Sequence, residues 1–595
     1  MKTVFKAPLL RGMAVVMSAT ALLYGCKDFL TNASEPQGTL NAGTLANRTG
    51  VEGSLIAAYR TLDCTNATSN EWGCAASNWV WGSVASDDSY KGSDGLDQPS
   101  INDVEGYHWG TPAAEHYLDV KWIHVYEGVV RANATLRLLK QVLASNPTEF
   151  SVAEARSIEG EAMFLRAHQH FEAWRMWGNI PYYREDDADF RKPNIDSSAV
   201  AVELLKDLDS AAKLLPLTPR NAQKGRVTAW TAKAYKGRVQ LYDHQYANAV
   251  ATFLDVKNNG PYDLEASFDR VWTAYGDLEN GKETILAYQA SANDGEPDAA
   301  NANWGERLNF PYDPSHFKCC GFNPPTQNLV NYFKVDANGL PLALSSPDTW
   351  NASDANFVAG DMTPVDPRLD WTVGREGVPF KDWGPYSTTW VRDLPNGGPY
   401  MPKKNIHEKN SGAEATVGWQ PEQQSSENIH LFRYADLLLM LAEAQVETND
   451  LAGAMANVNL VRNRAAAKAQ GPGTDRATTA VDINSSSITW AKYDVRPYTV
   501  FPSQAYAREA VRAERRVELA VEGQRFFDLR RWGVWQTAIT GYLRGVGGGR
   551  EDTRRLYLVA AENPQARHRF YPLPNSQVEL SKVGGQDMLK QNPGW

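Results

Sequence analysis

Apolar residues recur at every third or fourth position along much of the first half of the chain. This spacing places them on one face of a helix and predicts amphipathic helices that pack on one another. Short turns separate the segments, and small apolar residues alternate with large ones, which suggests tetratricopeptide-like helix pairs. The repeat length is too irregular to establish that repeat from its period alone. The predicted helices of this half span residues 51–62, 117–144, 154–177, 199–214, 228–242 and 244–254.

Helical spacing returns in the last third of the chain. Residues 428–447 and 454–467 form one predicted helix pair, and the run 437–441 is apolar on nearly all sides, which predicts burial. A further helix is predicted over 511–523, where Gly523 is the expected stop. Its charges fall on more than one face, so we expect some of them to be buried and paired by the aromatic segment that follows. The charged residues concerned are Arg515, Arg516, Glu518 and Glu522.

Two long regions, 63–111 and 261–422, have no such period. They are rich in Gly, Ser, Asn, Asp and Pro and contain many aromatic residues. Within the second region, residues 284–289 and 368–373 are short strand-like runs. Long aromatic loops of this kind are uncommon unless they bind something.

The first residues have the pattern of an export signal. Lys2, Lys6 and Arg11 precede an uncharged, mostly apolar run over 13–24 that is too short to span a bilayer comfortably. The run ends in the sequence LYGC, which resembles a bacterial lipobox and would place a lipid on Cys26. The alternative is a plain secretory signal followed by an incidental cysteine.

Composition and charge exclude several functions. A net charge of −10 and a pI near 5.6 argue against nucleic-acid binding. The ten histidines include no HExxH motif and the cysteines form no CxxC array, so no metal site and no cofactor is predicted. The adjacent carboxylates Asp87 and Asp88 more often cap a turn than form a glycosidase pair, and there is no GxSxG motif. No catalytic residue is predicted, and we do not expect an enzyme.

Four cysteines follow the lipobox, and an exported protein can oxidise them. Cys64 and Cys74 form the simplest local bridge. Cys319 and Cys320 are adjacent, and the sequence leaves open whether they pair with each other.

Several short sequences, taken in order along the chain, resemble landmarks of the SusD/RagB family of outer-membrane nutrient-uptake lipoproteins. No single landmark is specific, but the ordered set is. The matching sequences are CKDFL at 26–30, GEAMFLRA at 160–167, GNIPYY at 178–183, GRVT at 225–228, PTQNLV at 325–330, DPRL at 366–369, the charged and aromatic stretch 511–533, FYPLP at 570–574 and QNPGW at 591–595.

The resemblance implies a mainly α-helical, tetratricopeptide-like repeat body with long loop-rich insertions. We expect a signal peptide over 1–25 and one SusD-like domain over 26–595. That domain would comprise a tether over 26–38, the loop insertions 63–111 and 261–422, and a C-terminal family region over 423–595.

The resemblance also implies a function. The protein would be a surface-exposed lipoprotein, lipid-anchored in the outer membrane, that binds oligosaccharides as the lid of a SusC-like TonB-dependent transporter. Two alternatives remain: the same lid could take peptides or other nutrients, or the protein could be a secreted carbohydrate-active enzyme.

Sugar rings present C–H faces that lie against flat aromatic rings, while their hydroxyls need polar partners. The loop regions combine both kinds of side chain. We expect the two regions to meet in one shallow aromatic cleft, with Trp81 and Trp304 as stacking platforms and Asp87 or Asn303 as hydrogen-bonding partners. The full set of candidate ligand-binding residues is Trp79, Trp81, Asp87, Asp88, Tyr90, Trp109, Asn303, Trp304, Trp383 and Trp390.

Overall fold

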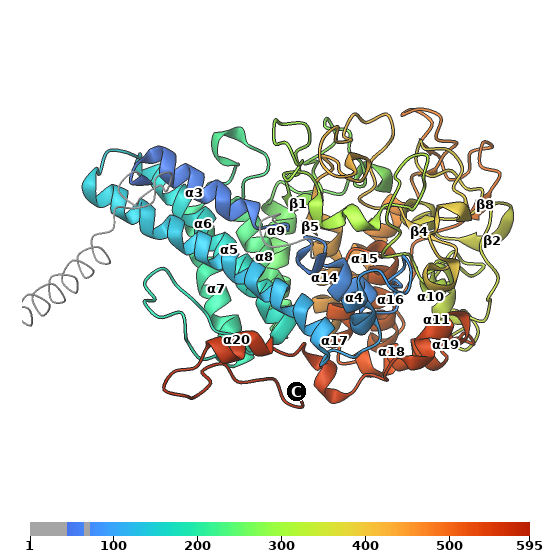
Figure 1. Ribbon diagram of the computed structural model, residues 1–595. Helices are drawn as coiled ribbons and strands as arrows, with labels where there is room; N and C mark the ends of the chain where they lie inside the picture. Colours follow the sequence, from blue (N-terminus) through green and yellow to red (C-terminus); the bar gives the residue numbers. More distant parts are fainter. Residues whose placement is uncertain (1–44, 65–71) are drawn as a thin grey trace, which may run out of the picture.

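The computed structural model describes residues 45–64 and 72–595 (Figure 1). The predicted signal peptide, Cys26 and the tether over 26–38 lie outside these residues. Within the two described ranges, none of the helices is long and apolar enough to cross a membrane.

Stacked helices form one side of the molecule. Each helix packs against the next one in the chain, as expected for helix pairs whose apolar faces are covered only by their neighbours. The long helices α5 and α6 run side by side in Figure 1, with α3 lying along them. These helices are α3 (Arg48–Arg60), α5 (Pro112–Ser145), α6 (Val152–Trp177), α7 (Ser197–Leu214), α8 (Ala229–Tyr242) and α9 (Tyr246–Asn259).

Side-chain caps fix where these helices begin. The hydroxyl of Ser151 accepts a hydrogen bond from the backbone N–H of Glu154, and the Glu154 carboxylate accepts from the backbone N–H of Ser151. Thr228 and Thr231 form the same reciprocal pair at the start of α8. Such capping boxes satisfy backbone donors that have no partner within the helix. The predicted helices of this half are confirmed, with starts that differ by a few residues.

The stack continues into the C-terminal third. Helix α14 (Tyr434–Glu447) packs against α9, and α15 (Leu451–Ala465) and α16 (Gln504–Glu518) pack against α14. The predicted burial of the apolar run 437–441 is confirmed, because all five side chains are fully buried. The predicted helix over 428–447 begins later than expected, at Tyr434. Its first residues instead form strand β5 (Ile429–Arg433), which pairs antiparallel with β1 (Thr284–Tyr288).

The rest of the chain is a loop-rich part held by short elements. The predicted strand over 284–289 is confirmed as β1, but 368–373 is mainly a helical turn. Asp366 bonds through its side chain to both the backbone and the guanidinium of Arg368, and this turn continues into α12 (Leu369–Thr372). The remaining strand pairs are β2 (Asp361–Val365) with β8 (Ala491–Tyr493), β3 (Val373–Gly374) with β4 (Met401–Pro402), and β6 (Ala469–Gln470) with β7 (Ala480–Val481). The remaining α-helices are α4 (Pro99–Glu105), α10 (Gln327–Tyr332), α11 (Leu342–Ser345), α13 (Leu394–Gly397), α17 (Arg525–Arg531), α18 (Trp535–Arg544), α19 (Glu551–Arg554) and α20 (Asn575–Leu580).

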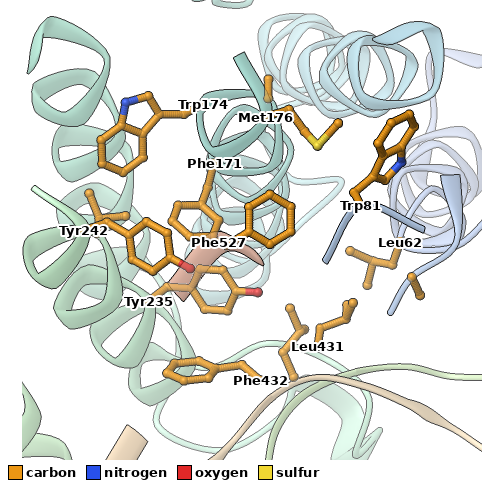
Figure 2. Close-up of a cluster of buried hydrophobic side chains, with 14 of the residues drawn as sticks. Leu62, Trp81, Phe171, Trp174, Met176, Tyr235, Tyr242, Leu431, Phe432 and Phe527 are labelled. Carbon is orange, nitrogen blue, oxygen red and sulfur yellow. The ribbon is translucent and has the colours of Figure 1, made fainter. Parts of the chain in front are cut away.

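The helical stack and the C-terminal region share one aromatic core. Figure 2 shows Phe171 of α6 close to Tyr235 and Tyr242 of α8 and to Phe527 of α17. The rings of Phe171 and Tyr242 meet edge-on, with their centroids 5.2 Å apart, an arrangement that aromatic rings prefer. This shared core fixes the loop-rich part against the repeats.

The charges of α16 are buried and paired, as predicted from their positions on several faces. Glu518 is fully buried and accepts hydrogen bonds from Arg368, Arg433 and Arg464. Arg515 pairs with Asp528, in the aromatic segment beyond the helix, at 2.8 Å.

Helix α16 ends at Glu518, before the predicted stop at Gly523. Gly523 has a φ of 67° in the turn that follows. A Cβ atom on Gly523 would lie 1.8 Å from the carbonyl oxygen of Ser77, so no side chain fits there. This turn brings the C-terminal region against the first loop region.

Both pairs of cysteines form disulfides. The predicted Cys64–Cys74 bridge closes a short loop. Cys319 and Cys320 pair with each other, which the sequence had left open.

Candidate functional site

The two loop regions meet, as predicted. The indole N–H of Trp79 donates to the carbonyl oxygen of Gly305 at 3.1 Å, and the Gly305 N–H donates to the carboxylate of Asp63 at 3.1 Å. Farther along, the backbone N–H of Ser93 donates to the carbonyl oxygen of Gly321 at 2.7 Å. These contacts join residues more than two hundred positions apart in the chain into one structure.

Arg307 lies between two tryptophan rings where these regions meet. Its guanidinium carbon is 4.4 Å from the ring centroid of Trp304 and 4.5 Å from that of Trp419. On the inner side, Trp304 stacks on Trp72 with ring centroids 5.8 Å apart. Trp304 and Trp72 are buried, whereas Trp419 is 59% exposed. The result is a layered arrangement whose outer ring faces solvent.

Local backbone structure places these side chains. Trp304 and Arg307 lie in a 3₁₀-helix, Trp304–Asn309, whose three-residue turn puts both side chains on the same side. Trp419 follows Gly418, which has a φ of 92° and lies so close to the carbonyl oxygen of Asp298 that a Cβ would be 2.7 Å away. The carbonyl oxygen of Trp419 accepts a hydrogen bond from the Arg307 guanidinium, which fixes the outer ring over the cation.

Arg307 is a buried cation without an acidic partner among the residues that the structure describes. Its neighbour in sequence, Glu306, bonds to the side-chain amide of Asn309 instead, at 2.9 Å. Burial lowers the pKa of Arg307 to about 10, so the group stays charged at neutral pH. The negative faces of the two indole rings supply part of the stabilisation that a carboxylate would otherwise give.

Several buried polar atoms around this cation have no hydrogen-bond partner in the described part of the chain. The set includes both donors and acceptors. An unpaired buried polar group costs about 1–3 kcal/mol unless water or another polar molecule pairs it, so these atoms make the region around Trp419 a candidate binding site. The donors are Trp72 Nε1, Asn303 Nδ2, Trp304 Nε1 and Arg307 Nε, and the acceptors are Gln420 Oε1, Glu422 Oε2 and Gln424 Oε1. We call Trp72, Asn303, Trp304, Arg307, Trp419, Gln420, Glu422 and Gln424 the Trp419 patch.

A second aromatic cluster adjoins the Trp419 patch. The half-buried Trp383 ring lies 4.5 Å from that of Phe317, centroid to centroid, and its indole N–H donates to the carbonyl oxygen of His407. Gln423 joins this cluster to the patch, because its side-chain amide donates to the carbonyl oxygen of Phe317 at 3.0 Å. The disulfide-bonded residue Cys320 contacts the same glutamine.

Four of the aromatic residues predicted to bind ligand do not face solvent. Trp79, Trp81, Tyr90 and Trp109 are 0–1% exposed. The indole of Trp81 donates to the carbonyl oxygen of Gly73 and meets the Tyr571 ring edge-on at 5.0 Å. The ring of Trp109 also stacks on Tyr571, with the ring centroids 4.1 Å apart. These side chains pack the core because the C-terminal segment covers the first loop region, so their assignment as ligand-binding residues is corrected. The other predicted platform, Trp304, is buried beneath Arg307, so the exposed ring is that of Trp419 instead.

The paired acids Asp87 and Asp88 are also enclosed. Asp87 accepts hydrogen bonds from Arg525 at 2.7 and 2.9 Å and lies 3.0 Å from Arg516. Burial alone would raise the pKa of Asp87, but the two guanidinium groups outweigh it and hold that pKa below its usual range. Asp88 is buried beside the same Arg516. Both acids therefore hold α16 and α17 against the first loop region, and neither lies within the Trp419 patch.

The other predicted residues divide between the two aromatic groups. Asn303 and Trp304 belong to the Trp419 patch, and Trp383 and Trp390 belong to the adjoining cluster, where Trp390 is buried against Tyr386. Sequence reasoning missed Arg307 and Trp419 as site residues. The available signal for Trp419 was a tryptophan in a polar segment bounded by Gly418 and Pro421, which is typical of an exposed turn.

A body of stacked helices that carries a loop-built patch of aromatic rings and unpaired polar groups defines a helical-repeat protein of the ligand-binding class. The chain belongs to the SusD family, because that family's model matches residues 282–595, more than half of the sequence. A second family model, described as starch-binding associating with outer membrane, matches residues 77–241.

Individual relatives share the fold at low sequence identity. A SusD-like protein from Formosa agariphila is 23% identical over 494 residues, covering 80% of this chain and 82% of the relative. A SusD-like protein from Bacteroides fragilis has a TM-score of 0.66 at 20% identity and covers 93% of this chain and 99% of its own. Surface glycan-binding protein A from Bacteroides thetaiotaomicron, in complex with laminarihexaose, has a TM-score of 0.64 at 16% identity, with 92% and 99% covered. A laminarin-binding SusD-like protein has a TM-score of 0.61 at 21% identity, with 92% and 100% covered.

Proposed function

We propose that this protein binds oligosaccharides at the Trp419 patch. The observation that carries the proposal is the group of unpaired donors and acceptors beside a solvent-exposed indole ring. A sugar hydroxyl both donates and accepts hydrogen bonds, so one ligand class can satisfy both kinds of atom. The same ligand would place a C–H face on the Trp419 ring.

The roles within the patch differ by depth. Trp419 is the outer platform, and Arg307 holds that ring in place from below while keeping its Nε–H free. Asn303 is fixed by accepting the backbone N–H of Ser425 at 2.8 Å, which leaves its buried side-chain N–H group unpaired in the layer beneath the outer ring. A rigid polar group loses little entropy on binding, which favours affinity.

Binding without catalysis is the activity that these groups support. The most suggestive pair of carboxylates, Asp87 and Asp88, is enclosed by Arg516 and Arg525. A general acid or nucleophile has to reach the bond that is broken, and these two do not face the patch. The proposal is therefore capture of a glycan and its release unchanged.

The names of the similar proteins support a glycan ligand and suggest which one to try first. Two solved structures of the same fold are described as laminarin-binding and as a complex with laminarihexaose. A peptide could also stack on Trp419, but it carries fewer groups that both donate and accept hydrogen bonds than an oligosaccharide does. We therefore place glycans ahead of peptides.

We further propose that the protein acts at the cell surface, as the lid of a SusC-like TonB-dependent transporter, anchored by a lipid on Cys26. The sequence LYGC and the family description that mentions the outer membrane support this proposal. Co-purification with a SusC-like transporter from the same cells would test the partnership, and failure to co-purify in mild detergent would contradict it.

Isothermal titration of the purified protein against a panel of oligosaccharides tests the binding function. The panel should contain laminarihexaose, maltohexaose, cellohexaose and an unstructured peptide of similar length. The proposal expects one glycan to bind with a one-to-one stoichiometry and the peptide not to bind. Binding of the peptide alone would contradict it.

A further inference from the structure

A cavity of about 430 Å³ lies between α5, the segment 183–191 and α20, and it shares no lining residue with the Trp419 patch. The helix α20, labelled at the lower edge of Figure 1, packs against α5. Gln577 holds it there by donating to Asp119 at 2.8 Å. Cavities of roughly 300–1,000 Å³ are the usual size for small-molecule sites.

Aromatic and aliphatic side chains form the walls. Trp122 and Tyr126 of α5 lie with ring centroids 4.6 Å apart, and Tyr183 meets Tyr126 edge-on at 5.7 Å. The rim includes three exposed apolar side chains, because Phe190, Leu580 and Val130 are 75%, 66% and 55% exposed. A large apolar rim around an apolar cavity is uncommon on a free surface.

Several polar groups of this cavity are already hydrogen-bonded within the protein. The Tyr126 hydroxyl donates to the carbonyl oxygen of Pro181 at 3.0 Å, and the Tyr183 hydroxyl donates to that of Phe190. Asn133 donates to the carbonyl oxygen of Tyr183 and accepts from Arg166. Within the described ranges, no cavity-lining residue holds a buried side-chain atom that lacks a partner. In this respect the cavity is the opposite of the Trp419 patch.

Most charges at the mouth are paired too, whereas Arg137 donates to the carbonyl oxygen of Glu185 and has no ion pair within the described ranges. Arg184 bonds to Asp207 and Glu203, and Arg191 pairs with Asp189. The remaining acid, Asp187, pairs with Lys192 at 2.8 Å. These internal pairs reduce the net attraction for a charged ligand.

We propose that this cavity is a second binding site, for a small uncharged aromatic molecule of one or two rings. Such a ligand would pack against Trp122, Tyr126 and Tyr183 without needing a hydrogen bond. A sugar would lose its bonds to water there and find few new ones, which is unfavourable. The site would therefore act independently of the glycan patch.

Isothermal titration with β-naphthol tests the proposal on the intact chain, with two rim variants and one control. Phe190→Ala and Val130→Glu alter exposed side chains, so both variants should fold. Leu217→Ala is the matched control, because Leu217 is 60% exposed and does not line the cavity. We expect one saturable site in the unmodified protein and in the control, and affinity weaker by about fivefold or more in both rim variants.

Saturating oligosaccharide from the glycan panel should leave the β-naphthol affinity unchanged. Binding that does not saturate, or equal affinity in all variants, would overturn the proposal. Competition between β-naphthol and the oligosaccharide would also overturn it, since the probe would then occupy the glycan patch.

Discussion

The guanidinium carbon of Arg307 lies 4.5 Å from the ring centroid of Trp419, so an almost fully buried cation supports an exposed tryptophan. The Arg307 guanidinium donates a hydrogen bond to the Trp419 carbonyl oxygen, which holds that ring in place. The charge of Arg307 has no carboxylate partner in the described part of the chain. An unpaired buried charge is unfavourable for folding. This unpaired charge is understandable if the site needs a rigidly held ring at Trp419 and an unpaired donor at Arg307.

Replacing Arg307 should therefore weaken binding without weakening the fold. We expect Arg307→Met to lose about tenfold in glycan affinity, since it removes the cation and the hydrogen bond that hold the Trp419 ring in place. The melting temperature should stay the same or rise, because removing an unpaired buried charge relieves its desolvation. Titration calorimetry and differential scanning calorimetry measure the two effects.

Arg375→Met is the matched control for that variant. Arg375 is equally buried but pairs with Asp370 at 2.6 and 2.8 Å. Removing it strands a buried carboxylate, so this variant should lose about 3–5 kcal/mol of stability. If Arg307→Met lost more stability than Arg375→Met, the conclusion that the Arg307 charge is unpaired would be wrong.

The network around Glu518 should dominate the stability of the C-terminal region. Glu518 accepts from three buried arginines, and Glu518→Ala leaves all three without that partner. We expect a loss of about 3–5 kcal/mol in urea unfolding. Glu509→Ala, on the exposed side of the same helix, should change stability by less than about 1 kcal/mol. Similar losses in both variants would contradict the assignment.

Stability should depend on pH through Glu105. Burial raises the pKa of Glu105 to about 7, although the Tyr557 hydroxyl, the Lys91 backbone N–H and the Lys91 charge all lower it. The folded protein therefore binds this proton more tightly than the unfolded chain, whose pKa is near 4.5. The resulting stabilisation is complete below about pH 4.5 and is lost as the pH rises through about 7.

Glu105→Gln keeps an acceptor for Tyr557 and removes the titration. We expect the variant to be more stable than the unmodified protein at pH 8, by up to about 3 kcal/mol, and equal to it near pH 4.5. Urea unfolding at both values gives the comparison. A stability difference that does not change with pH would rule out Glu105 as the titrating group.

Anchoring should depend on Cys26. Cys26→Ala removes the predicted lipid attachment, so the protein should move from the outer-membrane fraction to the soluble fraction. Cys64→Ala, which cannot affect the lipobox, is the control and should remain with the membrane. Membrane association of Cys26→Ala in cells that lack the transporter would show that another feature anchors the chain.

Much of the helical body could be predicted because amphipathic spacing survives in it. The long helices α5 and α6 were located to within a few residues by their apolar positions. The prediction failed where pairing with a distant strand determines the backbone conformation. Residues 429–433 have helical spacing, yet pairing with β1 makes them a strand.

The candidate site was harder, because local sequence does not determine whether a loop tryptophan is buried. Trp81 is enclosed by Tyr571, whose hydroxyl donates to the Trp81 carbonyl oxygen from 490 positions along the chain. Trp419 has no such cover and stays exposed. The contact between the two loop regions was predictable from the repeat body. Which tryptophan rings are exposed was not, because that depends on these long-range contacts.

Titration of Trp419→Ala with the glycan that binds best is the most direct test of the central claim. Trp230→Ala is the control, because Trp230 is a half-buried ring that also contacts a cation, with Lys233 4.3 Å from its centroid, but it lies on α8. The account predicts that Trp419→Ala loses about five- to thirtyfold in affinity, from lost stacking worth roughly 1–2 kcal/mol, with an unchanged melting temperature. The control should bind as the unmodified protein does. Full affinity in a folded Trp419→Ala variant would contradict the account and place the glycan site elsewhere.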